Sequence, residues 1–311
     1  MTWQLYQGDA LKIIKDLVSE SIHCCVTSPP YWGLRDYGVE GQLGLEPTPE
    51  EYVSKVVEVF REVKRVLRKD GTLWLNLGDS YAKEGLSGMG DPTIGERNLG
   101  GMEPIKKKIP QGLKPKDLVG IPWRVAFALQ SDGWYLRSDI IWSKPNPMPE
   151  SVIDRPSKSH EYIFLLSKSN RYYYDYKSIK EPVTESSIKR LAQTTLADQR
   201  GSSRVPCKTN GNMKAVGGIE YRNKRTVWNI PTSRFSEAHF ATFPTELVKP
   251  CILAGCPVGG TALDPYAGSG TTLFVAEQLE RNSVGIELKP EYCSLINRRM
   301  AGIETNLFQM Q

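Results

Sequence analysis

The sequence is poor in the features that several protein classes require. Its 311 residues include three histidines and six cysteines, none of them spaced as Cys-x-x-Cys. We therefore expect neither a disulfide scaffold nor a metal site. No apolar run approaches the ~20 residues of a membrane-spanning helix, and the N-terminal segment lacks the charged and apolar regions of a secretory signal. These absences predict a cytoplasmic protein with no membrane partner.

The charged residues are present in ordinary numbers but are unevenly distributed. The net charge is +5, whereas the stretch 170–228 holds twelve Lys or Arg and five Asp or Glu, a local balance of +7. A second basic cluster comprises Lys106, Lys107 and Lys108, followed by Lys114 and Lys116. One such cluster is typical of a solvated loop surface. Two basic segments outside the apolar core indicate a polyanion partner.

Hydrophobic periodicity predicts an α/β protein with a parallel sheet. A strand, a turn and a helix are expected over 3–18, and a helix over 48–70, with Thr48 as its cap and Pro49 at its first position. Further strands are expected at 21–28, 71–79, 134–144, 161–168, 261–265 and 282–287, and further helices at 117–131, 243–255, 270–280 and 290–300. We divide the chain into a first core segment (1–80), a basic insert (81–116), a second core segment (117–175), a polar basic region (176–228) and a third core segment (229–311).

A strand, a glycine turn and a helix near the C-terminus form the first candidate site. The sequence TALDPYAGSGTT (261–272) ends a predicted strand in Asp264, and Glu287 closes the next strand. Glycines admit a ligand close to the backbone, and the second acid is placed to bind ribose hydroxyls. Gly-x-Gly-x-x-Gly and a Walker lysine are both missing. An acid directly before the glycines suits S-adenosylmethionine, which is cationic and carries no phosphate, better than NAD or ATP; a tight turn without a ligand is the plainer alternative.

The segment Thr27-Ser28-Pro29-Pro30-Tyr31-Trp32 forms the second candidate site. The prolines end a predicted strand and fix a backbone whose carbonyls can face the crevice at the carboxyl ends of a parallel sheet. The Ser28 hydroxyl and the Pro29 carbonyl can accept hydrogen bonds from an amino group, and Tyr31 offers a flat face to a planar ring. The combination indicates a receptor for the exocyclic amine of a flipped base. A simple turn is the alternative, and Trp32 belongs either to the pocket or to the core.

Taken together, SPPY (28–31) and DPYAGSGTT (264–272) resemble the amino-methylating DNA methyltransferases, which methylate adenine N6 or cytosine N4. In that family, (Asp/Asn/Ser)-Pro-Pro-(Tyr/Phe) holds the target amine, and the D-P-x-x-G-S-G-T loop binds S-adenosylmethionine. The catalytic motif comes first here, which is the order of the beta class, with the DNA-recognition region between the two motifs. The resemblance implies a Rossmann-like S-adenosylmethionine-dependent methyltransferase sheet with circularly permuted motifs and an inserted basic recognition region at 176–228.

Other segments extend the resemblance along most of the chain outside 81–116 and 176–226. Gly8-Asp9-Ala10-Leu11 is similar to a cofactor-side motif of the family, and Trp142-Ser143-Lys144-Pro145-Asn146-Pro147 with His160-Glu161 is similar to a late core motif. His239-Phe240-Ala241-Thr242-Phe243-Pro244 is similar to the motif beside the methionine end of the cofactor. Read without the family, His160 and His239 are either general bases or structural residues, and Asp9 either contacts a ligand or shapes a turn.

The resemblance assigns roles to the candidate residues. The catalytic residues are Ser28, Pro29, Pro30 and Tyr31. The residues expected to bind S-adenosylmethionine are Asp9, Thr27, Phe243, Asp264, Pro265, Ala267, Gly268, Ser269, Gly270, Thr271 and Glu287. From the two basic segments, which the resemblance does not cover, the residues expected to contact duplex DNA are Lys106, Lys107, Lys108, Arg200, Arg204, Arg222, Lys224 and Arg225. A cognate restriction endonuclease and a homodimer are both compatible with the resemblance.

The residue at position 28 bears on the target base. Ser in the family tetrapeptide usually accompanies cytosine N4, and Asp or Asn usually accompanies adenine N6, so we expect methylation of cytosine N4, with adenine N6 as the alternative. Cytosine C5 methylation is disfavoured because both Pro-Cys pairs, Pro206-Cys207 and Pro250-Cys251, precede the cofactor loop. Methylation of RNA or of a protein amide, and a non-catalytic DNA-binding module, are the remaining alternatives.

Overall fold

The computed structural model describes residues 1–34, 38–39, 41–82, 85–86, 106–107, 109–194, 220–232 and 243–309. The chain divides into two compact units: unit 1 joins Met1–Tyr174 to Thr226–Gln311, and unit 2 is Asp175–Arg225. The five segments drawn from the sequence stay predictions, because a division by contacts does not test what each segment does. Within the described ranges, no helix has the length and apolarity needed to cross a membrane.

Unit 1 is built on an eight-stranded sheet with the strand order β1-β12-β11-β2-β3-β7-β6-β10. Parallel pairing joins β1 (Trp3–Gln7), β12 (Asn282–Glu287), β11 (Thr261–Asp264), β2 (Ile22–Thr27) and β3 (Leu67–Leu77). Strand β7 (His160–Ser167) runs antiparallel to β3 and β6 (Tyr135–Ser143), and β10 (Val227–Asn229) is parallel to β6. The prediction of an α/β fold with a mostly parallel sheet is confirmed.

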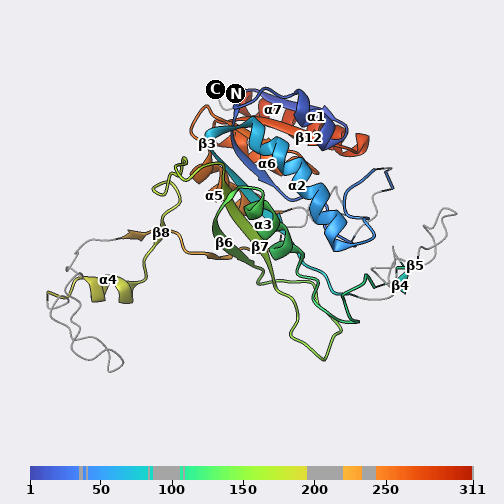
Figure 1. Ribbon diagram of the computed structural model, residues 1–311. Helices are drawn as coiled ribbons and strands as arrows, with labels where there is room; N and C mark the ends of the chain where they lie inside the picture. The colour runs from blue at the N-terminus through green and yellow to red at the C-terminus, as the bar shows by residue number, and fades with distance from the viewer. Residues whose placement is uncertain are drawn as a thin grey trace. The chain divides into compact units, whose positions relative to one another are not determined.

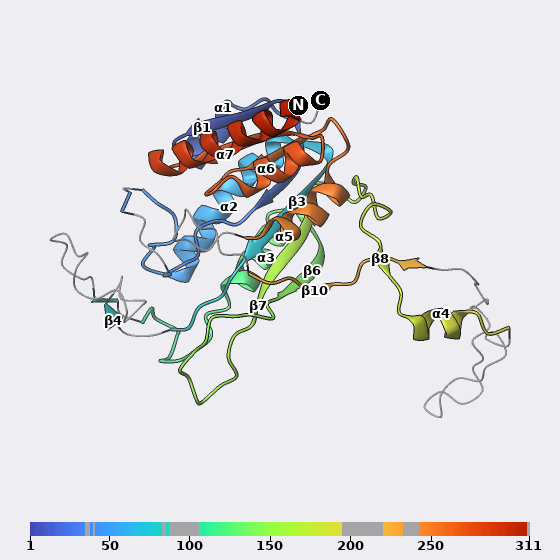
Figure 2. The same cartoon turned by 180° about the vertical axis from the view of Figure 1, so that it is seen from behind.

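Helices cover both faces of this sheet. On one face α1 (Ala10–Asp16), α2 (Pro49–Val66) and α3 (Ile121–Ser131) pack in a row (Figure 1). On the other face, α5 (Thr245–Gly255), α6 (Thr271–Gln278) and α7 (Pro290–Gln309) do the same (Figure 2). The central strands are therefore covered twice, so that nearly all of β2 and the part of β3 from Gly71 to Leu77 are buried on both faces.

Local signals correctly placed α2, but they misplaced its end and the start of α3. The Thr48 hydroxyl accepts from the Glu51 amide at 3.2 Å, as a cap does. The helix ends at Val66, not near residue 70, because Leu67 already pairs with Ile22 in the sheet. Helix α3 begins at Ile121, not at residue 117, because the Asp79 carboxylate accepts from the Gly120 and Ile121 amides at 3.0 Å.

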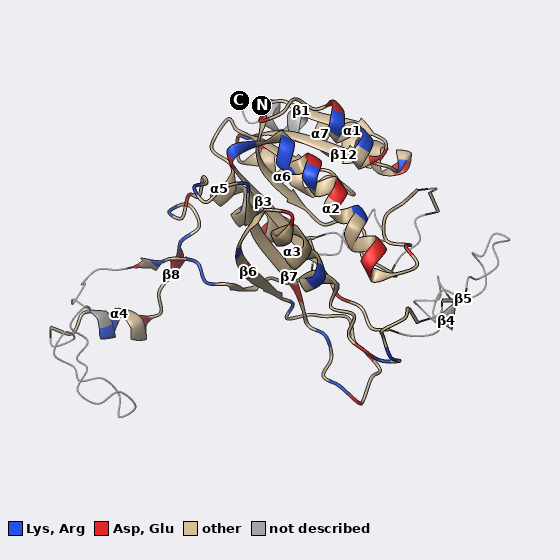
Figure 3. Ribbon diagram, viewed as in Figure 1, with Lys and Arg blue, Asp and Glu red and all other residues tan. Residues whose placement is uncertain are grey.

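Unit 2 contains a short antiparallel ladder and one helix in its described part. Strands β8 (Glu181–Pro182) and β9 (Tyr221–Arg222) pair, and α4 (Glu185–Leu191) is capped by Thr184. Basic residues lie in the last turn of α4 and in β9 and the segment after it (Figure 3). A separate ladder joins β4 (Gly85–Leu86) to β5 (Lys106–Lys107).

The strand order of unit 1 reverses between β11 and β2. From β2 the chain passes through α2 to β3 on one side, and from β11 it passes through α6 to β12 on the other side, with α2 and α6 on opposite faces. At such a reversal the two connections diverge and leave a crevice outside the carboxyl ends of the strands. Both sequence motifs lie at this edge, since one follows β2 and the other follows β11.

Candidate active site

A cavity of about 570 Å³ lies at this edge of the sheet in unit 1. Its volume is typical of a site for a small organic ligand. The segments that follow β2 and β11 both line it, so the fold unites two motifs that are far apart in the sequence. The predicted site residues on its wall are Asp9, Ser28, Pro29, Pro30, Tyr31, Phe243, Pro265, Ala267, Gly268, Ser269, Thr271 and Glu287.

Asp264 lies beneath the cavity wall and is fully buried. Its carboxylate accepts from the Thr27 and Thr272 hydroxyls, each at 2.7 Å, and from the Tyr266 amide at 3.1 Å. Burial raises the Asp264 pKa to about 6, against the opposing effect of these hydrogen bonds. Asp264 thus joins β2, α6 and the glycine loop. The wall does not include Asp264, Thr27 or Gly270, and their predicted contact with a cofactor stays a prediction.

The glycine loop owes its shape to backbone that other residues adopt with difficulty. Gly268 and Gly270 have φ values of 55° and 75°, in the left-handed region. A Cβ at Gly270 would also approach the Ile296 side chain to 3.0 Å. Glu287, at the end of β12, accepts from the Gly268 amide and the Lys289 amide, each at 2.8 Å. Burial raises the Glu287 pKa, and Glu287 also lines the cavity.

Asp9 does two things at once. Its Oδ1 accepts from the Lys12 amide at 2.9 Å, so it caps α1, and the residue also lines the cavity. The structural reading of the Gly8-Asp9 turn is therefore confirmed, while the contact with a cofactor stays a prediction.

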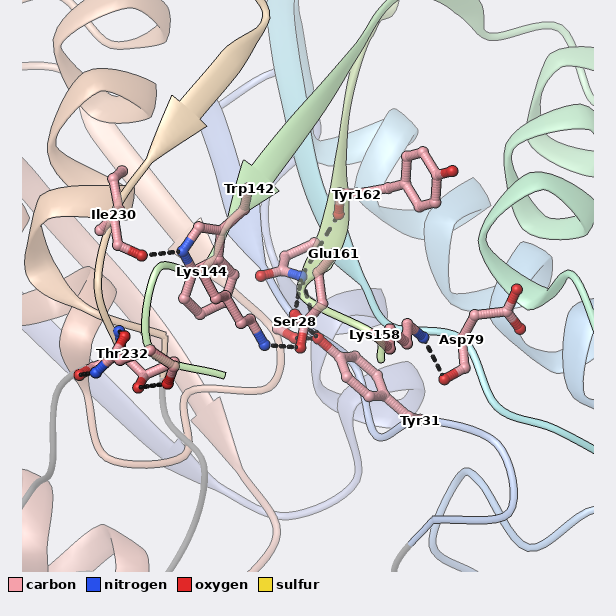
Figure 4. A network of polar contacts seen from close by, with 12 residues as sticks. Ser28, Tyr31, Asp79, Trp142, Lys144, Lys158, Glu161, Tyr162, Ile230 and Thr232 are labelled. Carbon is pink, nitrogen blue, oxygen red and sulfur yellow. Dashed lines mark hydrogen bonds and ion pairs between the residues drawn. The ribbon is translucent and has the colours of Figure 1, made fainter. Parts of the chain in front are cut away.

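On the opposite wall, Ser28 and Tyr31 belong to a polar network (Figure 4). The Ser28 hydroxyl lies 3.2 Å from the Tyr31 hydroxyl, which lies 2.8 Å from Glu161 Oε2. The Asn76 side-chain amide donates to the Tyr31 oxygen at 3.0 Å and to Glu161 Oε2 at 2.8 Å. Lys144 forms an ion pair with Glu161 Oε1. Burial, together with the nearby Glu161, raises the Tyr31 pKa well above its ordinary range, so the phenol keeps its proton.

Packing holds the two ends of this network. A Cβ on Gly78 would lie 2.5 Å from the Tyr31 ring, so the absence of a side chain there makes room for the ring. The Lys144 ammonium lies 4.2 Å from the centre of the Trp142 ring, and the Trp142 indole donates to the Ile230 carbonyl at 2.8 Å (Figure 4). The network is thus fixed both at Tyr31 and at Lys144.

Reasoning from the sequence missed Asn76 and attached no chemistry to Lys144 or Glu161 beyond their place in a motif. Asn76 carried a signal, because it interrupts the apolar strand LWLNL and is 5% exposed. A polar side chain buried in a central strand requires partners. Its partners, however, lie on β7 and in the segment after β2, and no local pattern identifies them.

The predicted DNA contacts that the structure describes are not among the residues that line the cavity. Lys106 and Lys107 form β5, whereas Lys108, Arg200 and Arg204 are outside the described residues. In unit 2, Arg222 and Arg225 donate to Glu181 Oε1 at 2.9 and 2.6 Å, and Lys224 lies between them in the sequence. Whether these residues bind DNA stays a prediction.

Several open alternatives receive an answer from the packing. The Trp32 indole donates to the Glu46 carbonyl at 2.9 Å, and Trp32 packs on the core without lining the cavity. His160 packs edge-on against Tyr162, in agreement with a structural role. His239 is outside the described residues. Cys24, Cys25, Cys251 and Cys256 are buried, as expected for core residues.

Comparison with known proteins agrees with this geometry. A family model described as DNA methylase matches residues 22–298. The chain is 48% identical to the Type II methyltransferase M.Cfr9I of Citrobacter freundii, over 98% of this chain and 90% of that protein. It is also 48% identical to M.SmaI of Serratia marcescens, over 94% and 89%. Among solved structures, the cytosine-N4-specific PvuII DNA methyltransferase matches with a TM-score of 0.63 at 19% identity, over 96% and 86%, a likeness of fold.

Proposed function

The chain belongs to the N6/N4 family of DNA methylases, and on that premise we propose that it transfers a methyl group from S-adenosylmethionine to N4 of cytosine in duplex DNA. Membership makes it an S-adenosylmethionine-dependent Type II DNA amino-methyltransferase. The proposal adds the target atom, extrusion of the base from the duplex, and the roles of individual residues.

One observation carries the proposal: the segment that binds amines in the family and the loop that binds the cofactor line a single cavity. The residues present fit S-adenosylmethionine. Acidic side chains at Asp9 and Glu287 suit a ligand with two cationic groups and ribose hydroxyls. Pro265, Ala267, Gly268, Ser269 and Thr271 would hold its methionine part, with Phe243 beside it, and Glu287 would bind the ribose.

On the amine side, the Ser28 hydroxyl and the Pro29 carbonyl would accept the two hydrogens of the target amino group. This arrangement turns the nitrogen lone pair toward the methyl group that the cofactor supplies. The amine needs no strong base before transfer, because the methylated ammonium is acidic and loses its proton afterwards. Positioning and electrostatics then provide most of the acceleration. Tyr31 would stack on the extruded base, and Pro30 would keep the backbone of the tetrapeptide in place.

Ser28 supports cytosine N4 as the target, because Ser at this position usually accompanies that amine in the family. Adenine N6 is the second candidate, since a hydroxyl can accept from either amine. Unit 2 supports a role in DNA recognition through Arg222, Lys224 and Arg225. A cognate endonuclease and a second copy of the chain are the further partners that this proposal includes, and the mass of the protein in solution tests the second.

Mass spectrometry of nucleosides tests the proposal. Unmethylated duplex DNA of varied sequence is incubated with S-adenosylmethionine and the wild type, Ser28→Ala, or Ser21→Ala, an exposed serine outside the cavity. We expect N4-methylcytosine from the wild type and the control, and a loss of about 10²-fold in Ser28→Ala, as for other single transition-state hydrogen bonds. N6-methyladenine would overturn the choice of base, and no transfer to any duplex would contradict the activity itself.

A further inference from the structure

The network around Glu161 has a definite direction of hydrogen bonding. Glu161 meets donors on both oxygens: Lys144 on Oε1, and Asn76 and Tyr31 on Oε2. A carboxylate has no hydrogen to give. The hydroxyl hydrogen of Tyr31 is therefore directed at Glu161.

The orientation of the Tyr31 hydroxyl in turn determines the orientation of the Ser28 hydroxyl. With its hydrogen on Glu161, the Tyr31 oxygen can only accept, and its two other neighbours are the Asn76 amide at 3.0 Å and the Ser28 hydroxyl at 3.2 Å. Ser28 thus directs its single hydrogen to Tyr31 and keeps its lone pairs. Since Ser28 lines the cavity, those lone pairs are what it has left for a ligand.

A hydroxyl with only lone pairs to offer is complementary to an amino group, which brings hydrogens. It is a poor partner for a carbonyl or a ring nitrogen, which bring lone pairs of their own. The direction of the network therefore decides which edge of a base can lie against Ser28.

We propose that Glu161 is a positioning residue that, through Tyr31, holds the Ser28 hydroxyl as a hydrogen-bond acceptor for the exocyclic amine of the target base. This inference rests on the proposed function and extends it. Glu161 acts on the base indirectly. It contacts Tyr31, Asn76 and Lys144, and the base lies beyond Ser28.

Replacement of Glu161 by Gln changes the direction of the hydrogen bonds but keeps the size and shape of the side chain. A Gln side chain has one oxygen and one amino group, whereas the site presents donors to both positions. Lys144 is the stronger donor and takes the oxygen, so the Gln amino group faces Tyr31. Tyr31 then accepts from Gln and donates to Ser28, and the Ser28 hydrogen turns toward the incoming amine.

Tyr31→Phe removes the hydroxyl that connects Glu161 to Ser28 and keeps an aromatic ring for stacking. Phe is also allowed at this position of the family tetrapeptide. Without the Tyr31 hydroxyl, Ser28 is free to turn, and it can still accept from the amine. The inference therefore requires an unusual relation between the two variants: Tyr31→Phe cancels the defect of Glu161→Gln.

The experiment measures, for the wild type and each variant, the single-turnover rate of methyl transfer to a duplex that the wild type methylates. The Michaelis constant for DNA is measured as well. We expect Glu161→Gln to lose at least about tenfold in rate, the usual scale for one misdirected hydrogen bond in a transition state. Tyr31→Phe loses less, and the double variant returns to the Tyr31→Phe rate. The Michaelis constant for DNA changes less than twofold throughout. Glu161→Asp, which keeps the charge, falls between the wild type and Tyr31→Phe.

Glu150→Gln is the matched control, because Glu150 pairs with Arg155 in the same loop between β6 and β7 and lies outside the cavity. Thermal midpoints and calorimetric affinity for S-adenosylmethionine show whether each variant is folded. Losses that multiply in the double variant would contradict the inference and leave the proposed function standing. If Glu161→Gln does not fold, a Glu161→Asp rate below that of Tyr31→Phe would also contradict it. A wild type that transfers no methyl group would overturn both.

Discussion

At the residue scale, the site separates acids that face the cavity from an acid that shapes it. Glu287 lies on the wall, whereas Asp264, which is as prominent in the sequence, is turned inward against two threonine hydroxyls. A fully buried carboxylate with three hydrogen bonds is costly when charged and is retained for the position that it imposes on its partners. The glycine loop is held from below by this residue.

The titration of Asp264 gives a prediction about stability. Its pKa is raised from 3.8 to about 6 in the folded protein, so folding favours the protonated acid. The stabilisation is complete below the unfolded pKa and is lost as the pH rises through 6, which amounts to about 3 kcal/mol at pH 7. Asp264→Asn does not titrate. The difference between the free energies of unfolding of Asp264→Asn and the wild type, both measured in urea, should therefore rise in favour of the variant by about this amount between pH 4 and pH 7. Parallel curves would contradict the assignment.

The contact between Gly78 and Tyr31 gives a second prediction at this scale. In Gly78→Ala, the new Cβ would stand 2.5 Å from the ring, so the ring must move and take its hydroxyl away from Glu161. We expect the methylation rate to fall at least about tenfold, with a loss of about 1–3 kcal/mol of stability from overpacking. Gly302→Ala, in open space on α7, is the control. An unchanged rate would show that the ring position does not matter.

At the scale of elements, local and distant signals contribute differently. Thr48 and Pro49 place the start of α2 by hydrogen bonds within the segment itself. The start of α3 depends on Asp79, which lies at the end of another strand and accepts from two amides of the helix start. The first kind of boundary can be predicted from the sequence. The second cannot, because its partner is distant along the chain.

Helix α1 depends in the same way on its neighbour α2. The guanidinium of Arg65, on α2, donates to the carbonyls of Ile14 at 2.7 Å and Leu17 at 3.0 Å, at the C-terminal end of α1. The last carbonyls of a helix lack the amide partners of its interior, and within α1 the Ile14 carbonyl accepts from the C-cap amide of Leu17 at 3.0 Å. Arg65→Ala should therefore lower the free energy of unfolding by about 1–3 kcal/mol. Arg68→Ala, which removes an exposed ion pair with Asp70, should cost less than about 0.5 kcal/mol. Equal losses in the two variants would contradict this role.

At the scale of the whole molecule, the described residues that line the cavity all belong to unit 1. They lie before residue 175 or after residue 225. The two points of unit 1 between which residues 175–225 are inserted lie close to each other. The Tyr174 and Trp228 rings both pack against Trp74, with ring centres 6.3 and 6.5 Å from that of Trp74. A short linker can therefore connect the two parts of unit 1.

Replacing 175–225 by a short Gly-Ser linker tests whether unit 1 binds S-adenosylmethionine by itself and whether unit 2 is needed for DNA recognition. We expect a folded protein with one cooperative thermal transition and unchanged calorimetric affinity for S-adenosylmethionine. Methylation of specific duplex sites should be lost, because the excess positive charge of the chain resides in this region. Methylation at the original sites by the shortened protein would place recognition elsewhere, and failure to bind S-adenosylmethionine would show that unit 1 depends on unit 2.

The sequence by itself determined the parallel sheet, the two motifs and their permuted order, because periodicity, proline and glycine act over a few residues. Most of the catalytic and cofactor residues that it assigned do lie on the cavity wall, since strand ends in a parallel sheet meet at one edge. Only the tertiary structure decided that Asp264 turns inward and that Asn76, Lys144 and Glu161 surround Tyr31. These contacts join residues that are distant along the chain, and packing alone selects them. The direction of the Ser28 hydrogen bond is likewise a property of the assembled network.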